Sequence, residues 1–339
     1  MTILLLATVL FVFPYNSDSS SDIPYDNLAY PVLLVSTGGT ETTTGSGFFY
    51  NRHDATYFVT ARHVLFDETS VELIEQFPLP HLLIHKAEWK QDDPKMKWIL
   101  VFYGVMSAKE KDELLSVAPR SVASKEAIQR LYRESQKLRL RRAAATLYSY
   151  SPKPSDSGLN QIQLELPKLY QAGQIMYHPS SDVALIRIAT PKKIGEQNLL
   201  TPIDGVTMTG PGILGLGKDT VKLFDDVLVG NTVYAFGYPT SISQLNPFMG
   251  VKFPLLRKGA LAGKNNSLKT IILDCPIYYG NSGGLVIEAE RIGFNTRFSA
   301  IGLVTNLVPY AGKWLQNSGY SIAVPMDFVE ELLKATSKN

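Results

Sequence analysis

The chain has 339 residues, of which 45% are hydrophobic, so it can bury a substantial core and is neither disordered nor fibrous. Its 33 basic and 31 acidic residues nearly cancel, and this balance excludes nucleic acid as a partner recognised through overall charge. Cys275 is the only cysteine, which excludes an intrachain disulfide.

The chain starts with an apolar segment from Ile3 to Phe13. A membrane-spanning helix needs about 20 residues, so this segment is better suited to the apolar region of a signal peptide. We therefore expect residues 1–14 to be a signal peptide or an N-terminal apolar segment, and the protein to be secreted or otherwise extracytoplasmic. No Lys or Arg precedes Arg52, which keeps two alternatives open: a buried N-terminal strand or a misassigned start. Membrane contact is expected only through this segment.

Short apolar runs separated by turn residues follow from Leu28 onward. This pattern predicts an all-β fold, and the number of runs suits two linked antiparallel β-barrels of six strands each. The predicted strands are Tyr30–Val35, Gly47–Tyr50, Tyr57–Val59, Gln161–Leu166, Val183–Ile188, Val227–Val229, Thr232–Phe236, Thr270–Leu273, Gly284–Ile287, Ala300–Val304 and Ser321–Val324.

Residues 67–158 have a different character, and we expect a mainly helical insertion in the first barrel. Ser107 and Glu110 have capping-box spacing before a helix that ends near Pro119. A second helix is predicted over 124–145, and between Lys125 and Arg142 seven residues are basic and two acidic. This helix is either a solvated face packed on the barrel or a lid or docking surface.

The last segment predicts a closing helix over Met326 to Ala335, because apolar residues recur there at helical spacing directly after Pro325. We expect residues 15–339 to form one domain, with no appended binding module after this helix.

A serine enclosed by glycines lies in the segment from Tyr279 to Gly284, just before an apolar strand. Glycines allow the backbone to turn tightly and to direct its N–H groups at a substrate carbonyl. Ser282 is therefore a candidate nucleophile, and the N–H groups of Gly280 and Ser282 are a candidate oxyanion hole. A purely structural turn is the alternative.

A serine hydroxyl needs a base to remove its proton. His63 is the best candidate among the five histidines, because it follows an apolar strand that ends in small and polar residues. The other four, which have plainer surroundings, are His53, His81, His85 and His178. His81 and His85 have the spacing of two metal ligands on a helix, but no third ligand accompanies them, so we expect no metal site.

The base in turn needs a carboxylate that fixes its tautomer. Asp182 lies where a polar loop enters the apolar strand that begins at Val183. An acid at such a place is partly buried and requires a partner. Asp67 and Asp274 are competitors by composition alone.

These segments together resemble the trypsin-like, chymotrypsin-fold serine peptidases, and most closely the disulfide-free bacterial HtrA-like members. The order His, Asp, Ser along the chain is that of the family. The segments that carry the resemblance are Gly45–Phe49, Phe58–Val64, Asp182–Ile186, Val233–Pro239, Asp274 with Gly280–Gly284, and Gly319–Pro325. The sequence shows no PDZ-like domain, so HtrA-like assembly is not implied.

The resemblance implies that Ile277 and Tyr278 line the primary pocket and that the strand containing Val304, Thr305 and Asn306 pairs with the substrate backbone. None of these side chains is charged, so we expect an uncharged residue before the cleaved bond. Asn281 stands where enzymes activated by N-terminal cleavage have an aspartate. An amide cannot form the activating ion pair, so we predict that no such cleavage is needed.

The predicted function is therefore a serine endopeptidase that hydrolyses protein or peptide substrates through a covalent acyl-enzyme, without a metal or cofactor. Two alternatives remain at this point. One is a catalytically silent protein that binds a peptide as an added strand, and the other is a membrane-surface protein attached through Ile3–Phe13 and the basic helix.

Overall fold

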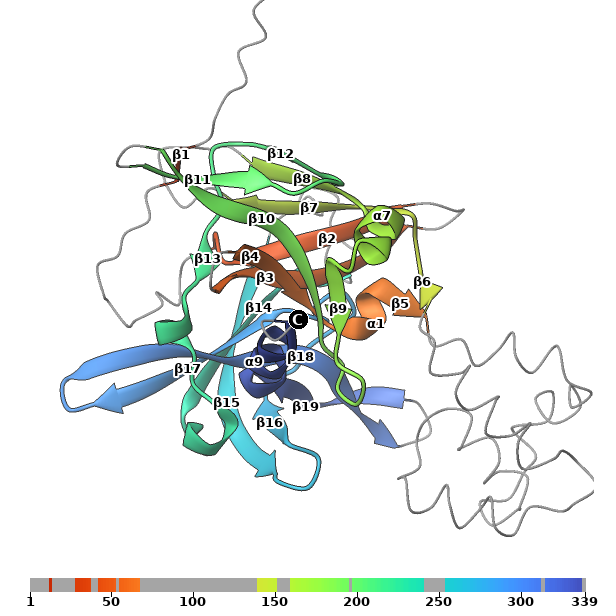
Figure 1. The fold of residues 1–339 in the computed structure, drawn as a ribbon. Helices are drawn as coiled ribbons and strands as arrows, with labels where there is room; N and C mark the ends of the chain where they lie inside the picture. The colour runs from red at the N-terminus through yellow and green to blue at the C-terminus, as the bar shows by residue number, and fades with distance from the viewer. Residues whose placement is uncertain are drawn as a thin grey trace, which may run out of the picture. The chain divides into compact units, whose positions relative to one another are not determined.

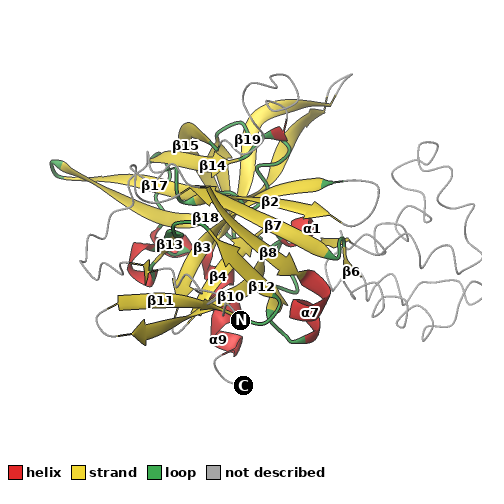
Figure 2. Ribbon diagram, turned by 90° about the horizontal axis from the view of Figure 1, so that it is seen from above, coloured by secondary structure: helices red, strands yellow, loops and turns green. Residues whose placement is uncertain are grey.

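The computed structural model describes residues 12–13, 28–37, 42–52, 55–67, 139–150, 159–194, 197–240, 254–311 and 315–336. Strands dominate these ranges, and helices are few and short (Figure 2). The chain divides into two compact units, one of residues 1–65 and 142–339 and the other of residues 66–141. In the second unit the described residues form a strand pair, β5 (Phe66–Asp67) and β6 (Arg139–Leu140).

Within the described ranges of the first unit, an eleven-stranded sheet comes first along the chain. Its path runs β1-β11-β10-β4-β3-β2-β7-β8-β12, with β9 beside β10 and β13 beside β3 (Figure 1). The strands are β1 (Val12–Phe13), β2 (Pro31–Thr37), β3 (Thr43–Arg52), β4 (Ala55–Thr60), β7 (Ala144–Tyr150), β8 (Leu159–Glu165), β9 (Ile175–Tyr177), β10 (Ala184–Ile194), β11 (Gln197–Pro202), β12 (Val206–Thr209) and β13 (Gly215–Leu216).

A closed barrel of six strands follows, in the order β14-β15-β16-β19-β18-β17. Its core is a cluster of buried apolar side chains that includes Val233, Leu261, Ile271, Val286 and Ile301. The strands are β14 (Thr232–Gly237), β15 (Leu255–Asn265), β16 (Thr270–Asp274), β17 (Leu285–Ile292), β18 (Asn295–Ala311) and β19 (Leu315–Pro325).

The described helices are α1 (Arg62–Leu65), α7 (Leu166–Gln171), α9 (Met326–Thr336) and the 3-10 helices η1 (Lys218–Thr220) and η2 (Phe224–Asp226). None of them has the length and apolarity that crossing a bilayer requires. Helix α9 buries Met326, Val329 and Leu333, which recur on one helix face. Its Glu330 accepts hydrogen bonds from Tyr50 and Arg52 on β3, so α9 is fastened to the first sheet.

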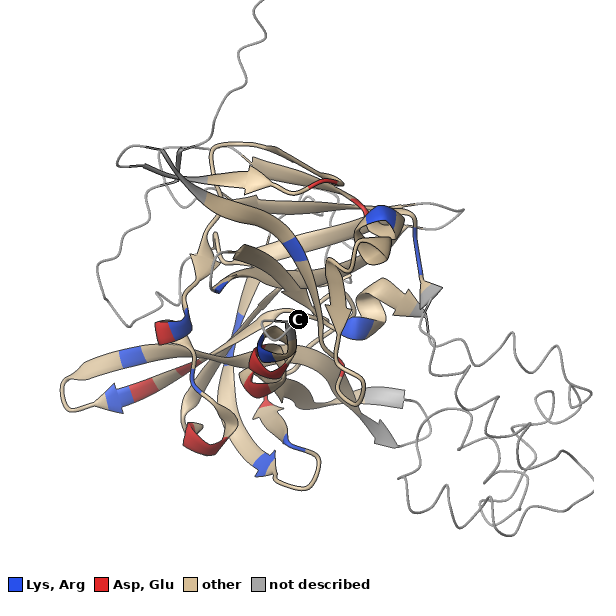
Figure 3. Cartoon of the chain, in the orientation of Figure 1, with Lys and Arg blue, Asp and Glu red and all other residues tan. Residues whose placement is uncertain are grey.

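Charged residues of both signs are scattered over the described strands and α9 (Figure 3). Lys222 shows how several of them are paired, because its ammonium contacts both Glu288 and Glu290 at 2.9 Å. Glu288 is fully buried and also accepts hydrogen bonds from the Leu228 N–H and the Asn231 amide. Each charge in this cluster therefore has a partner of opposite sign within the fold.

The predicted all-β class, the two-barrel architecture and the C-terminal helix are confirmed. The predicted count of six strands holds only for the second half, which is a closed barrel, whereas the sheet of the first half has eleven strands. The strand predicted over Val227–Val229 is wrong: η2 ends just before it, Leu228 and Val229 are exposed, and the Leu228 N–H donates to the side chain of Glu288 rather than to a strand backbone.

The helix predicted over 124–145 is wrong at its end, because Arg139–Leu140 and Ala144–Tyr150 are strands and β7 pairs with β2 and β8. Residues 124–138 of that helix and the helix before Pro119 lie outside the described residues, so the helical insertion stays a prediction there. Of residues 1–14 only Val12 and Phe13 are described, and they pair with Leu199 and Asn198 of β11.

Candidate active site

His63 and Asp182 meet because the strands next to them are neighbours. His63 lies on α1, just after β4, and Asp182 lies in the turn just before β10. These strands are antiparallel, and Ala184 pairs with Thr60. The end of β4 and the start of β10 are therefore side by side, which brings together two residues that are 119 positions apart.

Both carboxylate oxygens of Asp182 bind His63. One accepts the backbone N–H of His63 at 2.9 Å, and the other contacts the ring Nδ1 at 2.6 Å. A carboxylate at Nδ1 holds the proton on that nitrogen and leaves Nε2 as a proton acceptor. The backbone bond also fixes the direction from which the carboxylate approaches. The His63 ring is thus held in one orientation, with Nε2 as the nitrogen that can accept a proton.

The protonation of this pair follows from its surroundings. Burial acts to raise the pKa of Asp182, but the hydrogen bonds and charge of His63 outweigh it, so the pKa lies below the ordinary value of 3.8. The side chain of Asp182 is 22% exposed and that of His63 is 37% exposed. Asp182 therefore stays ionised while the imidazole remains accessible to a reacting group.

The loop that carries Ser282 is attached to the first sheet through Ser46, which is fully buried on β3. The Ser46 N–H donates to the carbonyl of Ser282 at 2.8 Å, and its hydroxyl donates to the carbonyl of Gly280 at 2.6 Å. The same hydroxyl accepts the N–H of Tyr238 at 2.9 Å. Ser46 thus holds the backbone on both sides of Asn281.

Gly283 brings the Ser282 loop against the strand that leads to His63. A Cβ at Gly283 would lie 2.1 Å from the Ser46 carbonyl oxygen, 2.3 Å from Thr60 Oγ1 and 2.8 Å from the Ala61 nitrogen. Only glycine permits this approach, and its φ of +86° independently favours glycine. Ser282 directly precedes Gly283, and Gly283 lies against the backbone of Ala61, two residues before His63. Among the described residues, no hydrogen bond joins the Ser282 hydroxyl to the His63 ring.

The amides of Gly280 and Ser282 are free of protein acceptors, as far as the described residues go, whereas their neighbours are engaged. The N–H groups of Asn281, Gly283 and Gly284 donate to Tyr278, Val304 and Asn281 respectively. In a trans peptide the C=O and N–H point in opposite directions. Thr240 holds the Tyr279 carbonyl and Gly284 holds the Asn281 carbonyl, so the two free amides have fixed directions.

The predicted substrate-contacting residues fall into two groups. Tyr278 is 38% exposed and Asn306 is also exposed, whereas Ile277, Val304 and Thr305 are buried. The backbone N–H and C=O of Val304 are bound to Gly284 and Gly283. Val304 therefore supports the loop that carries Ser282, and its own backbone N–H and C=O are already engaged.

Sequence reasoning missed three residues of this region: Ser46, Arg62 and Arg257. The Arg257 guanidinium lies 4.5 Å from the centre of the Tyr278 ring, so the predicted pocket wall has a cation beside it. Arg62 donates to the carbonyls of His178 and Pro179. The role of Ser46 could have been predicted from Gly45 and Gly47, because glycines on both sides of a residue indicate that another backbone approaches closely there.

The competing candidates lie elsewhere. Asp274 is exposed at the end of β16, and Asp67 lies on β5 in the other compact unit. His178 binds Glu331, and His53, His81 and His85 lie outside the described residues. The part of the chain that the structure describes contains no group of three His, Cys, Asp or Glu side chains that could hold a metal ion.

Comparison with solved structures and curated sequences adds little. Two structures of an HtrA-type protease, AlgW, each with a tripeptide and one of them a variant, match with 13% identity and a TM-score of 0.43. Each match covers 92% of this chain, and the chain spans about 63% of the length of the AlgW chain. No curated protein sequence matches.

The comparison with protein families is informative. The family model described as the trypsin-like peptidase domain matches residues 45–291, a range that includes Ser46, His63, Asp182 and Ser282. Because this match covers most of the chain, the protein belongs to the trypsin-like peptidase domain family.

Proposed function

We propose that this protein is a serine endopeptidase that hydrolyses protein or peptide substrates, with Ser282 as nucleophile, His63 as general base and Asp182 as the residue that orients His63. The observation that carries the proposal is the convergence of three features at the junction of the two sheets: an oriented imidazole, a glycine-enclosed serine docked beside it and two amides with fixed directions.

In the proposed reaction His63 Nε2 takes the proton of the Ser282 hydroxyl as its oxygen attacks the substrate carbonyl carbon. The negative charge on the carbonyl oxygen is stabilised by the N–H groups of Gly280 and Ser282. His63 then gives the proton to the leaving amine, and a water molecule activated by the same imidazole hydrolyses the acyl-enzyme. Asp182 stays ionised and stabilises the imidazolium formed in each half of the reaction.

We also propose that the uncut chain is active without N-terminal cleavage. The N–H of Gly280 shares a peptide group with the Tyr279 carbonyl, which Thr240 binds. The N–H of Ser282 shares a peptide group with the Asn281 carbonyl, which Gly284 binds, so both N–H groups are already oriented. Asn281 itself is 4% exposed and is neutral, so it offers no carboxylate to a newly cut N-terminus. Its position depends on Ser46 and on contact with Gly237, which are present in the uncut chain.

The residue before the cleaved bond is proposed to be uncharged, and Lys and Arg in particular are disfavoured. Tyr278 offers an exposed aromatic ring, and its neighbour Ile277 is apolar and buried. Arg257, stacked on Tyr278, adds a positive charge at this wall. A basic substrate side chain would lose its water without gaining a carboxylate partner, and it would be repelled by Arg257.

Hydrolysis of a fluorogenic peptide library by wild type, Ser282→Ala, His63→Ala and the matched control Ser267→Ala tests the proposal. Ser267 is an exposed serine in the turn after β15. Removing Ser282 or His63 should lower kcat by about 10⁴- to 10⁶-fold, whereas Ser267→Ala should have no effect. Saturable peptide binding without turnover by the wild type would instead support the silent peptide-binding alternative.

A further inference from the structure

Asp182 lies in a tight turn, and its position depends on the shape of that turn. The N–H of His178 donates to the carbonyl of Val183 at 2.9 Å, and the N–H of Val183 donates to the carbonyl of Ser181 at 2.9 Å. These bonds close residues 178–183 into one loop, which we call the aspartate turn. The carboxylate of Asp182 reaches His63 only while this turn keeps its shape.

Arg62 holds the aspartate turn from outside. Its Nη1 donates to the carbonyl of His178 at 2.7 Å and to that of Pro179 at 3.0 Å. Arg62 precedes His63 on α1, so adjacent residues bind the turn and its aspartate. The charge of Arg62 also contributes, after the larger effects of burial and His63, to the lowered pKa of Asp182.

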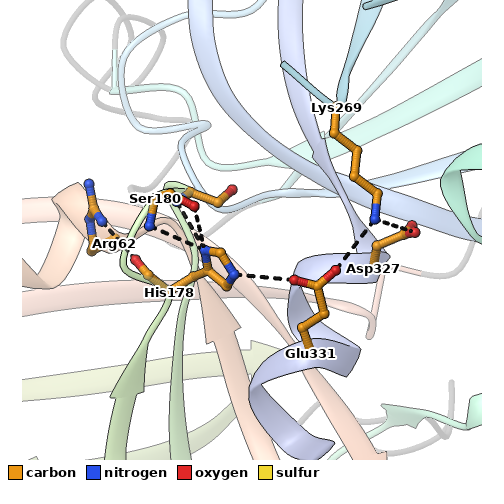
Figure 4. A network of polar contacts seen from close by, with 7 residues as sticks. Arg62, His178, Ser180, Lys269, Asp327 and Glu331 are labelled. Atoms are coloured by element: carbon orange, nitrogen blue, oxygen red, sulfur yellow. Dashed lines mark hydrogen bonds and ion pairs between the residues drawn. The ribbon is translucent and has the colours of Figure 1, made fainter. Parts of the chain in front are cut away.

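The ring of His178 holds the turn from inside. Nδ1 lies 3.1 Å from the N–H nitrogen of Ser181 and 3.4 Å from that of Ser180 (Figure 4). An N–H donor requires a lone pair at its acceptor, so Nδ1 is unprotonated and the ring proton lies on Nε2. Nε2 faces Glu331 of α9 at 3.3 Å. The aspartate turn is thereby linked to the C-terminal helix.

The groups that face His178 come from several elements. Phe328 of α9 packs edge-on against its ring, with centroids 4.8 Å apart. Lys269, from the turn before β16, contacts Glu331 at 3.4 Å and Asp327 at 3.0 Å. Burial lowers the pKa of His178, the bond to Glu331 acts against this, and the charges of Arg62 and Lys269 lower it further. His178 is therefore neutral at neutral pH.

We propose that Arg62 and His178 are positioning residues for Asp182, and that they act by fixing the backbone of the aspartate turn. This inference rests on the proposed peptidase function. Neither residue touches the reacting atoms. Their contribution is to keep the Asp182 carboxylate in place as the charge on His63 changes during the reaction. Protonation of His178 would add a proton at Nδ1, where the Ser181 N–H now finds its acceptor. The added proton would therefore loosen the turn.

Two His178 variants separate positioning from packing. His178→Asn places an amide oxygen near the Nδ1 position, so it keeps the acceptor for Ser181 and removes the ring. His178→Phe keeps a ring against Phe328 and removes the acceptor. We expect His178→Phe to lower kcat by up to about 10²-fold with little change in KM, since small misplacements of a reacting group cost this much. His178→Asn should retain most of the wild-type kcat.

Arg62 is tested in the same way. Arg62→Ala should lower kcat, and Arg62→Lys should restore part of the loss, because an ammonium still donates to the two carbonyls. The ratio of kcat in wild type to kcat in His178→Phe should also decrease as the pH falls below the ordinary His pKa of 6.5. At such pH values His178 becomes protonated, so the wild type also loses the Nδ1 acceptor. Thermal unfolding of each variant establishes that it is folded.

The outcomes separate the two proposals. Unchanged kcat in His178→Phe, or equal losses in His178→Phe and His178→Asn, would overturn the positioning role. A wild type without Ser282-dependent hydrolysis would overturn the peptidase function instead. In that case the NMR resonance of the His63 Nδ1 proton decides the positioning role. The resonance should persist in His178→Asn and be lost in His178→Phe. Its persistence in both variants would overturn the proposal.

Discussion

The backbone N–H of Ser46 donates to the carbonyl oxygen of Ser282 at 2.8 Å, although Ser46 belongs to the first sheet and Ser282 to the loop that enters the barrel strand β17. This bond, with the one from the Ser46 hydroxyl to Gly280, places the proposed nucleophile beside the histidine that must activate it. The proposed site therefore depends on residues that take no part in its chemistry.

Ser46→Ala should reduce activity without removing any reacting group. The substitution frees the Gly280 carbonyl and leaves the buried Tyr238 N–H without its acceptor. We expect kcat to fall by roughly tenfold to 10²-fold, less than for complete loss of an oxyanion donor, and stability to fall by about 1–3 kcal/mol. Ser36→Ala is the matched control, because Ser36 is a buried serine on the neighbouring strand β2. Equal kcat losses in both variants would show that general destabilisation is responsible.

Gly283→Ala should abolish activity through steric conflict. The added Cβ would meet the Ser46 carbonyl at 2.1 Å, so the Ser282 loop must move away from β3. Gly293→Ala is the control, because Gly293 also has positive φ but its Cβ would meet nothing within 4 Å. Both variants carry about 1–2 kcal/mol of backbone strain, which thermal unfolding measures. Only Gly283→Ala should lose kcat, and retained activity there would contradict the docking of the loop.

Asp182→Asn should lower kcat by about 10⁴-fold with little change in KM, because an amide cannot stabilise the imidazolium or enforce the correct tautomer. The lowered pKa of Asp182 also makes a prediction for stability. Its contribution is complete above the unfolded pKa of 3.8 and is lost as the pH falls through the lower folded value.

Urea unfolding of Ser282→Ala, with and without Asp182→Asn, measures that contribution without interference from self-cleavage. The stability difference between the two proteins should be constant near neutral pH and should shrink below about pH 4. A difference that grows as the pH falls would contradict the assignment of an ionised carboxylate.

Arg257→Gln should weaken the discrimination against basic substrates. Removing one like charge near Tyr278 should raise the relative kcat/KM for peptides with Lys or Arg before the cleaved bond by roughly tenfold, which corresponds to about 1.4 kcal/mol. Arg297→Gln on β18 is the control, since Arg297 is exposed on the strand segment paired with β17. Wild-type cleavage mainly after Lys or Arg would refute the proposed specificity.

Much of the fold could be predicted from the sequence, because the strands that build the core are short apolar runs bounded by turns. Tyr57–Val59 and Val183–Ile188 became parts of the buried neighbours β4 and β10. Strand β15 escaped prediction because Leu261 is its only fully buried residue, so it has no alternating pattern. Strand β7 escaped because its alanines follow a helix-like basic segment, and pairing with β2 and β8 overrides that propensity.

The contacts that support the site were beyond sequence reasoning. His63, Asp182 and Ser282 could be chosen because each lies beside a strand end and has a residue type that the chemistry requires. The Arg62 contact with His178 spans 116 residues and the Ser46 contact with Gly280 spans 234. Nothing local marks Arg62 or His178, since their roles depend on how the aspartate turn and α9 meet in the folded chain.

The most direct test of the central claim is reaction with a fluorophosphonate probe, followed by intact-mass measurement and peptide mapping of the product. The proposed site predicts a single adduct on Ser282 of the uncut chain, its absence in Ser282→Ala, and strongly slowed labelling in His63→Ala. Labelling at another residue, or labelling that is independent of His63, would contradict an imidazole that activates the Ser282 hydroxyl.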